Sequence, residues 1–151
     1  MATNDDTIST LNNLIETCKD GENGFRTAAE GVKKSELTTL FNTYAQQRAR
    51  FASELQAEVR RIGGDPEQTG SVAASLHRGW INIKSVVTGE DEAAIIAECE
   101  RGEDSAVANY QEALKANLPA DAQSVVQRQY TDVKAAHDKI RDMKQASGAA
   151  K

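Results

Sequence analysis

Residues 63–89, "GGDPEQTGSVAASLHRGWINIKSVVTG", decide how this chain is connected, because they separate two long helical patterns. At roughly 27 residues, the connection is far too long for a tight turn between neighbouring antiparallel helices. Apolar residues at helical spacing predict that the connection holds a short helix of its own, over about residues 71–87. A connection of this length and helicity can carry the chain back along a bundle.

Four long amphipathic segments flank this connection and predict helices over about residues 7–32, 35–62, 90–117 and 119–144. Ser35 suits the N-cap of the second helix, and residues 146–151 suit a frayed tail. The first two helices are separated by a short break, as are the last two, so each pair predicts an antiparallel hairpin. Two hairpins joined by one long crossover predict an all-α, ferritin-like four-helix bundle, in a single domain over residues 1–151.

Composition excludes several classes of function. The chain has 23 acidic and 18 basic residues, interspersed, with a net charge of −5 and no basic patch for nucleic acid. No apolar run is long enough to span a membrane, and no signal peptide is visible, so we expect a cytoplasmic protein. Cys18 and Cys99 form no CxxC motif and are expected to be buried free thiols. The oligomeric state, including a homo-oligomer, stays open.

Every long helix carries a polar residue where its inward stripe calls for an apolar one. These residues are Glu22 on the first helix, Arg48 beside Gln47 on the second, Glu100 and Glu103 on the third, and His137 on the fourth. At about 1.5 Å of rise per residue, all of them fall near the middle of the bundle. Because a buried isolated charge costs several kcal/mol, the residues of this layer must neutralise one another or bind a counterion.

Two interpretations of the layer follow. In the first, the side chains of Glu22, Glu100, Glu103 and His137 bind one divalent ion, iron, manganese or zinc, since Glu and His from facing helices are the usual donors in such bundles. In the second, no metal binds, and an ionic network around Arg48 and Gln47 fixes the helix register. Arg48 would then pair bidentately with Glu22 or Glu103.

Glycines accompany the layer at positions where helices rarely use them. Gly21 and Gly24 lie on either side of Glu22, and Gly102 precedes Glu103. Each glycine costs a helix roughly 1 kcal/mol relative to alanine. We therefore expect a neighbouring helix or the crossover to approach closely at these points.

The crossover contributes His77 and Trp80, in "LHRGW". The simpler interpretation is that Trp80 anchors the crossover on the bundle while His77 hydrogen-bonds locally. In the alternative, His77 contacts a small ligand or a second metal ion.

The stretches "KDGENGF", "YAQQRARFASEL", "LHRGW", "ERGEDSAVANYQEAL" and "HDKIRDM" resemble a bacterial ferritin-like family of four-helix-bundle proteins of unknown function. The resemblance implies the fold and supplies no activity. In the wider di-iron pattern the second and fourth helices would each carry Glu-x-x-His. Here the second has Gln47 and Arg48 at that level, and the fourth keeps only His137, so a complete di-iron oxidase site is missing.

The chain also has no GxSxG, P-loop, dinucleotide-binding or HExxH motif, so we do not expect an enzyme. The sequence predicts a bundle protein, of the stress-related kind, whose polar layer holds one metal ion. The alternative is a structural or partner-binding bundle whose ionic layer only sets helix register.

Overall fold

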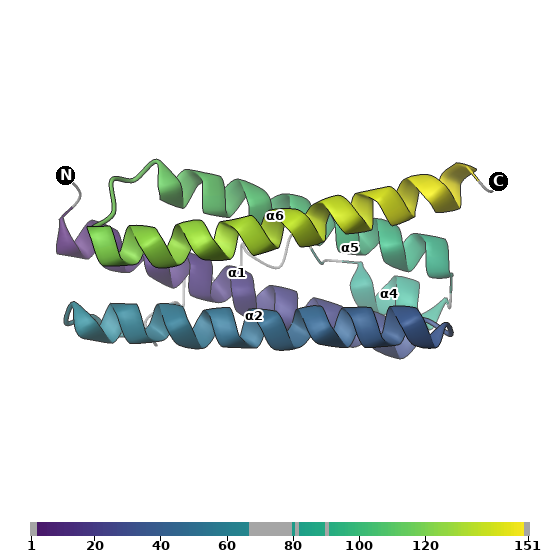
Figure 1. Cartoon of the computed structure of the whole chain (residues 1–151). Coiled ribbons are helices and arrows are strands. Elements are labelled where there is room, and N and C mark those ends of the chain that lie inside the picture. The colour runs from purple at the N-terminus through teal and green to yellow at the C-terminus, as the bar shows by residue number, and fades with distance from the viewer. Residues whose placement is uncertain (1–2, 67–79, 81, 90, 150–151) are drawn as a thin grey trace.

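The computed structural model describes residues 3–66, 80, 82–89 and 91–149 (Figure 1). All regular elements in these ranges are helices: α1 (Asn4–Gly31), α2 (Ser35–Arg61), α4 (Ile83–Thr88), α5 (Glu92–Leu114) and α6 (Ala120–Ala149). The four long helices match the predicted ones within a few residues at most ends. The fold is an all-α, ferritin-like bundle, as predicted.

Local capping explains where the helix ends differ from the prediction. A capping box starts α1 early: the Asp6 amide donates to Thr3 Oγ1 at 3.1 Å, and the Thr3 amide donates to the Asp6 carboxylate at 3.4 Å. The predicted cap at Ser35 is wrong, because Lys34 is the N-cap of α2 and makes no side-chain cap hydrogen bond. The predicted frayed tail is also wrong, since α6 continues to Ala149.

The order of the helices is that of two hairpins joined by a crossover. Helix α2 ends at one end of the bundle and α5 begins at the other, so α2 and α5 run in the same direction (Figure 1). Gly63, with φ of +86°, turns the chain out of α2. Of the crossover helix predicted over 71–87, the described residues show Trp80 and α4, and the remainder lies outside them. Helix α4 packs against α1 and α5.

The apolar core is divided into two clusters. One contains Leu11, Cys18, Phe51, Ala106, Tyr110 and Val126, among others. The other contains Phe25, Ala45, Trp80, Cys99 and Ile140, among others. On three helices, buried residues of a different kind fall between the two clusters, among them Gly21 on α1, Arg48 on α2 and Glu103 on α5. A polar layer therefore crosses the bundle at the boundary between the clusters.

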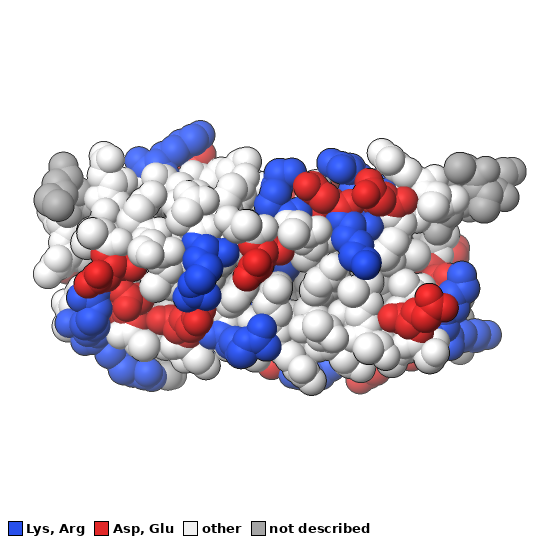
Figure 2. Space-filling model, in the orientation of Figure 1, with Lys and Arg blue, Asp and Glu red and all other residues white. Residues whose placement is uncertain are grey.

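Charged side chains of both signs are mixed over the face that Figure 2 shows. None of the helices in the described ranges is both long and apolar enough to cross a membrane.

Candidate functional site

The centre of the polar layer is a buried pair formed by Arg48 of α2 and Glu103 of α5. Arg48 Nη1 donates to Glu103 Oε1 and Arg48 Nη2 donates to Glu103 Oε2, each at 2.6 Å. The two side chains are 1% and 0% exposed. This two-point geometry is the strongest form of ion pair that proteins make, because the planar guanidinium matches the carboxylate. Of the two partners predicted for Arg48, the structure selects Glu103.

Two further contacts hold the guanidinium of Arg48 in place, and a glycine leaves room for its stem. Arg48 Nε donates to Gln47 Oε1 at 3.2 Å, and Arg48 Cζ lies 5.4 Å from the ring centre of Phe25. Gly21 leaves room for the Arg48 stem, since a Cβ there would lie 3.3 Å from Arg48 Cγ. Burial alone would lower the pKa of Arg48, but the charge and hydrogen bonds of Glu103 more than offset it, so that pKa is raised. The guanidinium therefore stays charged, and both oxygens of Glu103 stay occupied.

A second chain of polar contacts, buried except at Glu54, links all four long helices. Tyr110 donates its hydroxyl to Gln129 Oε1 at 2.8 Å, and Gln129 Nε2 donates to Glu54 Oε1 at 2.9 Å. Because the single hydroxyl proton of Tyr110 goes to Gln129, Cys18 Sγ, 3.1 Å from that hydroxyl, acts as the donor. Burial raises the pKa of Cys18 to about 11, which keeps the sulfur protonated for this role.

Trp80 docks on the bundle in a slot between two glycines. A Cβ built on Gly24 of α1 or on Gly102 of α5 would overlap the indole ring of Trp80. The ring also packs edge-on against Phe25, with 5.0 Å between ring centres, and is 7% exposed. The expectation of close approach at the glycines is therefore confirmed. His77, the other predicted crossover contact, lies outside the described residues.

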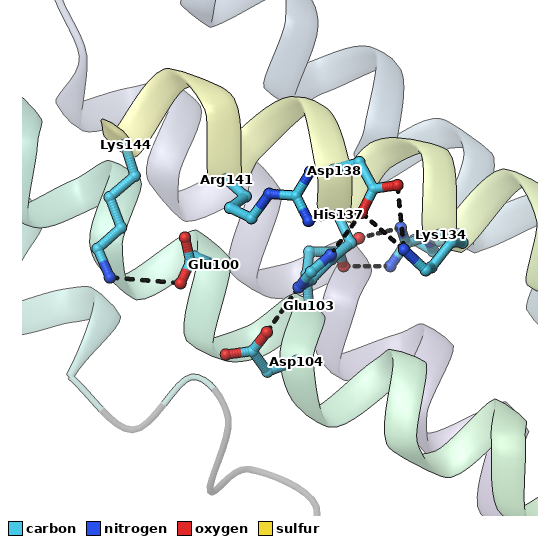
Figure 3. A network of polar contacts seen from close by, with 9 residues as sticks. Glu100, Glu103, Asp104, Lys134, His137, Asp138, Arg141 and Lys144 are labelled. Carbon is cyan, nitrogen blue, oxygen red and sulfur yellow. Dashed lines mark hydrogen bonds and ion pairs between the residues drawn. The ribbon is translucent and has the colours of Figure 1, made fainter. Parts of the chain in front are cut away.

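The side chains of Glu22, Glu100 and His137 are 24%, 17% and 14% exposed, so they lie nearer the surface than Arg48 and Glu103. Figure 3 shows Glu100 and His137 with their partners. Glu22 pairs at 2.7 Å with Arg26, one turn further along α1. Glu100 pairs at 3.3 Å with Lys144 of α6. Glu22 and Glu100 therefore take no part in the contacts of Arg48, and the predicted layer reduces to Arg48, Gln47 and Glu103.

His137 lies between two carboxylates. Its Nε2 is 2.6 Å from Asp104 Oδ1 on α5, and its Nδ1 is 3.0 Å from Asp138 Oδ1 (Figure 3). Because an ionised carboxylate only accepts hydrogen bonds, both contacts form together only when both ring nitrogens of His137 donate, that is, in the charged imidazolium. His137 is thus an ion-pairing residue that links α5 to α6.

The four predicted metal donors are not brought together. Within the described ranges, no group of three or more His, Cys, Asp or Glu side chains has an arrangement that could hold a metal ion. Glu103, Glu22, Glu100 and His137 each satisfy their charge with a different protein partner.

Comparison with known proteins places the chain in a family. The family described as "Domain of unknown function (DUF2383)" matches residues 6–116. The chain belongs to this family. Its match to the motifs of α1, α2 and α5 agrees with the resemblance seen in the sequence, and no curated protein matches the chain.

A solved structure confirms the fold of this DUF2383 protein. It is the crystal structure of a two-domain protein from Anabaena variabilis that contains DJ-1/ThiJ/PfpI-like and ferritin-like domains. The superposition has a TM-score of 0.78 at 16% identity and covers 97% of this chain and 41% of that one. The chain therefore spans less than half of that protein, and at this identity the likeness concerns the fold alone.

The metal ions that ferritin-like bundles commonly bind do not fit the centre of this DUF2383 chain. A metal at Glu103 would have to displace Arg48 from both carboxylate oxygens, which leaves a buried guanidinium without its counterion. It would also approach a fixed positive charge at short range in a site of low dielectric constant. The residues present therefore form a closed ion pair and not a coordination site.

Sequence reasoning missed the partners that complete these contacts. Asp104 and Asp138 directly follow Glu103 and His137 in the sequence, so a search for acids beside the predicted layer would have found them. Gln129 is fully buried, although a glutamine is usually found at the surface. A buried glutamine does not appear in a search for apolar residues at helical spacing. The role of Gln129 is visible only in the structure, where its Oε1 accepts the hydrogen bond from the hydroxyl of Tyr110.

His137 makes the stability of the bundle depend on pH. Partial burial lowers the pKa of His137, but hydrogen bonds to Asp138 and Asp104 outweigh it, so that pKa is raised above 6.5. Hydrogen bonds from Lys134 and His137 lower the pKa of Asp138 to about 2, so this carboxylate stays charged at neutral pH. Because the pKa of His137 is higher in the folded state than in the unfolded state, protonation of His137 stabilises the fold. This stabilisation is complete below the unfolded-state pKa and is lost as the pH rises through the folded-state pKa.

We therefore expect His137 to stabilise the bundle more at about pH 6 than at about pH 9. The measurement is urea unfolding at both values for the wild type and His137→Gln, since the variant removes the titration. The difference in unfolding free energy between the two proteins should be larger at the lower pH. An equal difference at both values would show that His137 makes no charged pair with Asp104 and Asp138.

Proposed function

We propose that this DUF2383 protein is a non-catalytic, partner-binding helical bundle, and that Arg48 and Glu103 set the register of α2 against α5. The two hydrogen bonds of 2.6 Å between fully buried side chains are the observation that supports this proposal. A buried ion pair is weak evidence for stability, but it is well suited to specifying one alignment of two helices.

The pair can set the register because a misalignment of α2 against α5 would be costly in free energy. A slip of α2 by one turn, about 5.4 Å, would separate the guanidinium from the carboxylate completely. Each charge would then stay buried without a partner, at a cost of several kcal/mol. A purely apolar layer at the same position would tolerate such a slip far better, because one aliphatic side chain can replace another.

The chemistry of the other buried groups supports the same proposal. The protonated thiol of Cys18 is a poor nucleophile, and Cys99, whose pKa burial raises well above 9.0, is another. Both are free cysteines, which also suits our proposal of a cytoplasmic protein. With no reactive thiol in the core, we propose that a partner binds to the exposed faces of the helices.

Metal analysis tests this proposal against the metal-binding alternative. The protein is purified without chelator, and iron, manganese and zinc are measured in the wild type, in Glu103→Ala and in His137→Ala. We expect far less than one ion per chain in the wild type and no systematic loss in either variant. About one ion per chain, lost in both variants, would contradict the proposal and support a metal centre.

A further inference from the structure

A long stretch of α2, residues 37–49, has an uncharged outer surface. Its only charged residue is Arg48, which is buried at 1% exposure. Figure 2 shows this stretch as a white area over α2, in the lower right part of the view. A stretch of similar length on α6, residues 127–138, carries four charged residues at or near the surface: Arg128, Asp132, Lys134 and Asp138. Because the centres of protein interfaces are depleted in charge, the outer face of residues 37–49 has the composition of an interface centre.

The middle of this surface could be covered at little cost. Thr43 donates its hydroxyl to the Thr39 carbonyl oxygen at 2.8 Å, so its hydrogen is already bonded within α2. Burying a hydroxyl is expensive mainly when it loses a hydrogen bond to water and gains none. Leu40 and Tyr44, beside Thr43, are only partly buried, so they offer apolar area that is still in contact with water.

A charge without a partner lies at each end of the uncharged surface. Glu36 and Arg50 are both exposed, and neither side chain makes an ion pair or a hydrogen bond with a residue of the described ranges. In contrast, the guanidinium groups of Arg26, Arg61 and Arg128, on other exposed positions, each pair with a carboxylate. The outer face of α2 therefore presents one acid and one base that the fold itself does not use.

These two charges are placed symmetrically about Thr43. Each lies seven residues from Thr43, which is about two turns and 10.5 Å along the helix, so all three residues share one face of α2. When a second α2 is laid antiparallel on this face, with a two-fold axis at Thr43, Glu36 of each copy lies opposite Arg50 of the other. A parallel pair would instead bring like charges together. The face is therefore complementary to itself in one orientation.

We propose that a second copy of this chain binds to the outer face of α2, as an antiparallel pair of α2 helices held at its ends by two Glu36–Arg50 ion pairs. This inference rests on our proposal that the bundle binds a partner through its exposed helix faces, and it names that partner. One pair of helices covers less area than a standard interface of about 1,600 Å², so the dimer is expected to be weak and reversible.

Charge reversal tests this pairing. Sedimentation equilibrium over about 5–500 µM gives the dimer dissociation constant of the wild type, Glu36→Arg, Arg50→Glu and the double variant. Each single reversal creates two contacts between like charges and should weaken the dimer about tenfold or more. The double variant Glu36→Arg/Arg50→Glu exchanges the two charges and should dimerise like the wild type. A wild type that stays monomeric over the whole range, or a double variant as weak as the single ones, would overturn the proposal.

A mixture of the two single variants separates a contact between chains from an effect within one chain. Glu36 lies in the first turn of α2, where an acid also favours the helix dipole, but a second chain cannot restore that effect. The mixture should form heterodimers more tightly than either variant associates with itself, and their absence would contradict the proposal.

Lys139→Glu is the matched control, because it changes the net charge as Arg50→Glu does but alters an exposed residue of α6. It should dimerise like the wild type, and a loss equal to that of Arg50→Glu would overturn the proposal. The metal analysis does not depend on association. A monomeric protein without metal would therefore end this inference and leave the proposed function standing.

Discussion

Replacing Glu103 by alanine is expected to lower the free energy of unfolding by about 3–5 kcal/mol. The substitution leaves the guanidinium of Arg48, which is 1% exposed, without the carboxylate that pairs with it in the described part of the chain. It also removes packing volume next to the apolar clusters. Urea unfolding followed by circular dichroism measures the change.

The double variant Arg48→Met/Glu103→Leu should recover most of this loss. It removes both charges at once, and apolar side chains of similar volume replace a buried ion pair at little or no cost in stability. If the pair sets register, as we propose, this variant should be stable but less uniquely packed, with broader amide resonances than the wild type.

Glu22→Ala is the matched control for Glu103→Ala. Both substitutions remove a glutamate from an ion pair with an arginine, but Glu22 pairs with Arg26 near the surface, where the side chains are 24% and 53% exposed. An exposed pair of this spacing contributes only about 0.3–0.5 kcal/mol. If Glu103→Ala cost no more than Glu22→Ala, the central pair would not have the role that its burial implies.

Gly102→Ala is expected to expel Trp80 from its slot. The new Cβ would overlap the indole ring, and overpacking of this kind costs about 1–3 kcal/mol or more. The higher helix propensity of alanine offsets about 1 kcal/mol of that cost. We expect lower stability and a red shift of tryptophan emission, which reports Trp80 alone because the chain has a single tryptophan.

Gly89→Ala provides the control, since a Cβ there would make only an ordinary contact, 3.6 Å from the Val86 carbonyl oxygen. A second check is the pair of variants Trp80→Val and Trp80→Val/Gly102→Ala. With the large ring absent, the added methyl group should cost little. Emission and stability in Gly102→Ala that match those of Gly89→Ala would show that the slot does not fit the ring tightly.

The connectivity of the helices could be predicted because it depends on patterns that extend over many residues. The alternation of three and four residues identifies each long helix, and the length of residues 63–89 requires a crossover. The match to a ferritin-like domain confirms this arrangement. The positions of the helix ends were predicted less accurately, because they depend on single contacts such as the hydrogen bond between Thr3 and Asp6.

The inward face was predicted less well where a small or polar residue occupies it. On α1 the sequence favoured Glu22, but Gly21 is the buried residue, and on α6 it favoured His137, but Ala136 is the one that is 2% exposed. In both cases the core position is the neighbouring residue with the smaller side chain. Gly21 could not be identified from its own side chain, because it is small where Arg48 lies against α1.

The identity of the partner of Arg48 could not be predicted for a related reason. Glu22 and Glu103 fall at similar heights in the bundle, so spacing alone leaves both open. In the structure Glu22 pairs with Arg26 on its own helix, and Gly21 is the residue of α1 that lies against Arg48.

The most direct measurement of the central ion pair is nitrogen-15 NMR of the Arg48 guanidinium. Because its two Nη groups donate to different oxygens of Glu103 and are shielded from solvent, rotation about the Cζ–N bonds and exchange with water should both be slow. We predict separate, slowly exchanging Nη–H resonances at neutral pH that disappear in Arg48→Lys. A single averaged signal that exchanges as fast as that of an exposed arginine would contradict the closed pair.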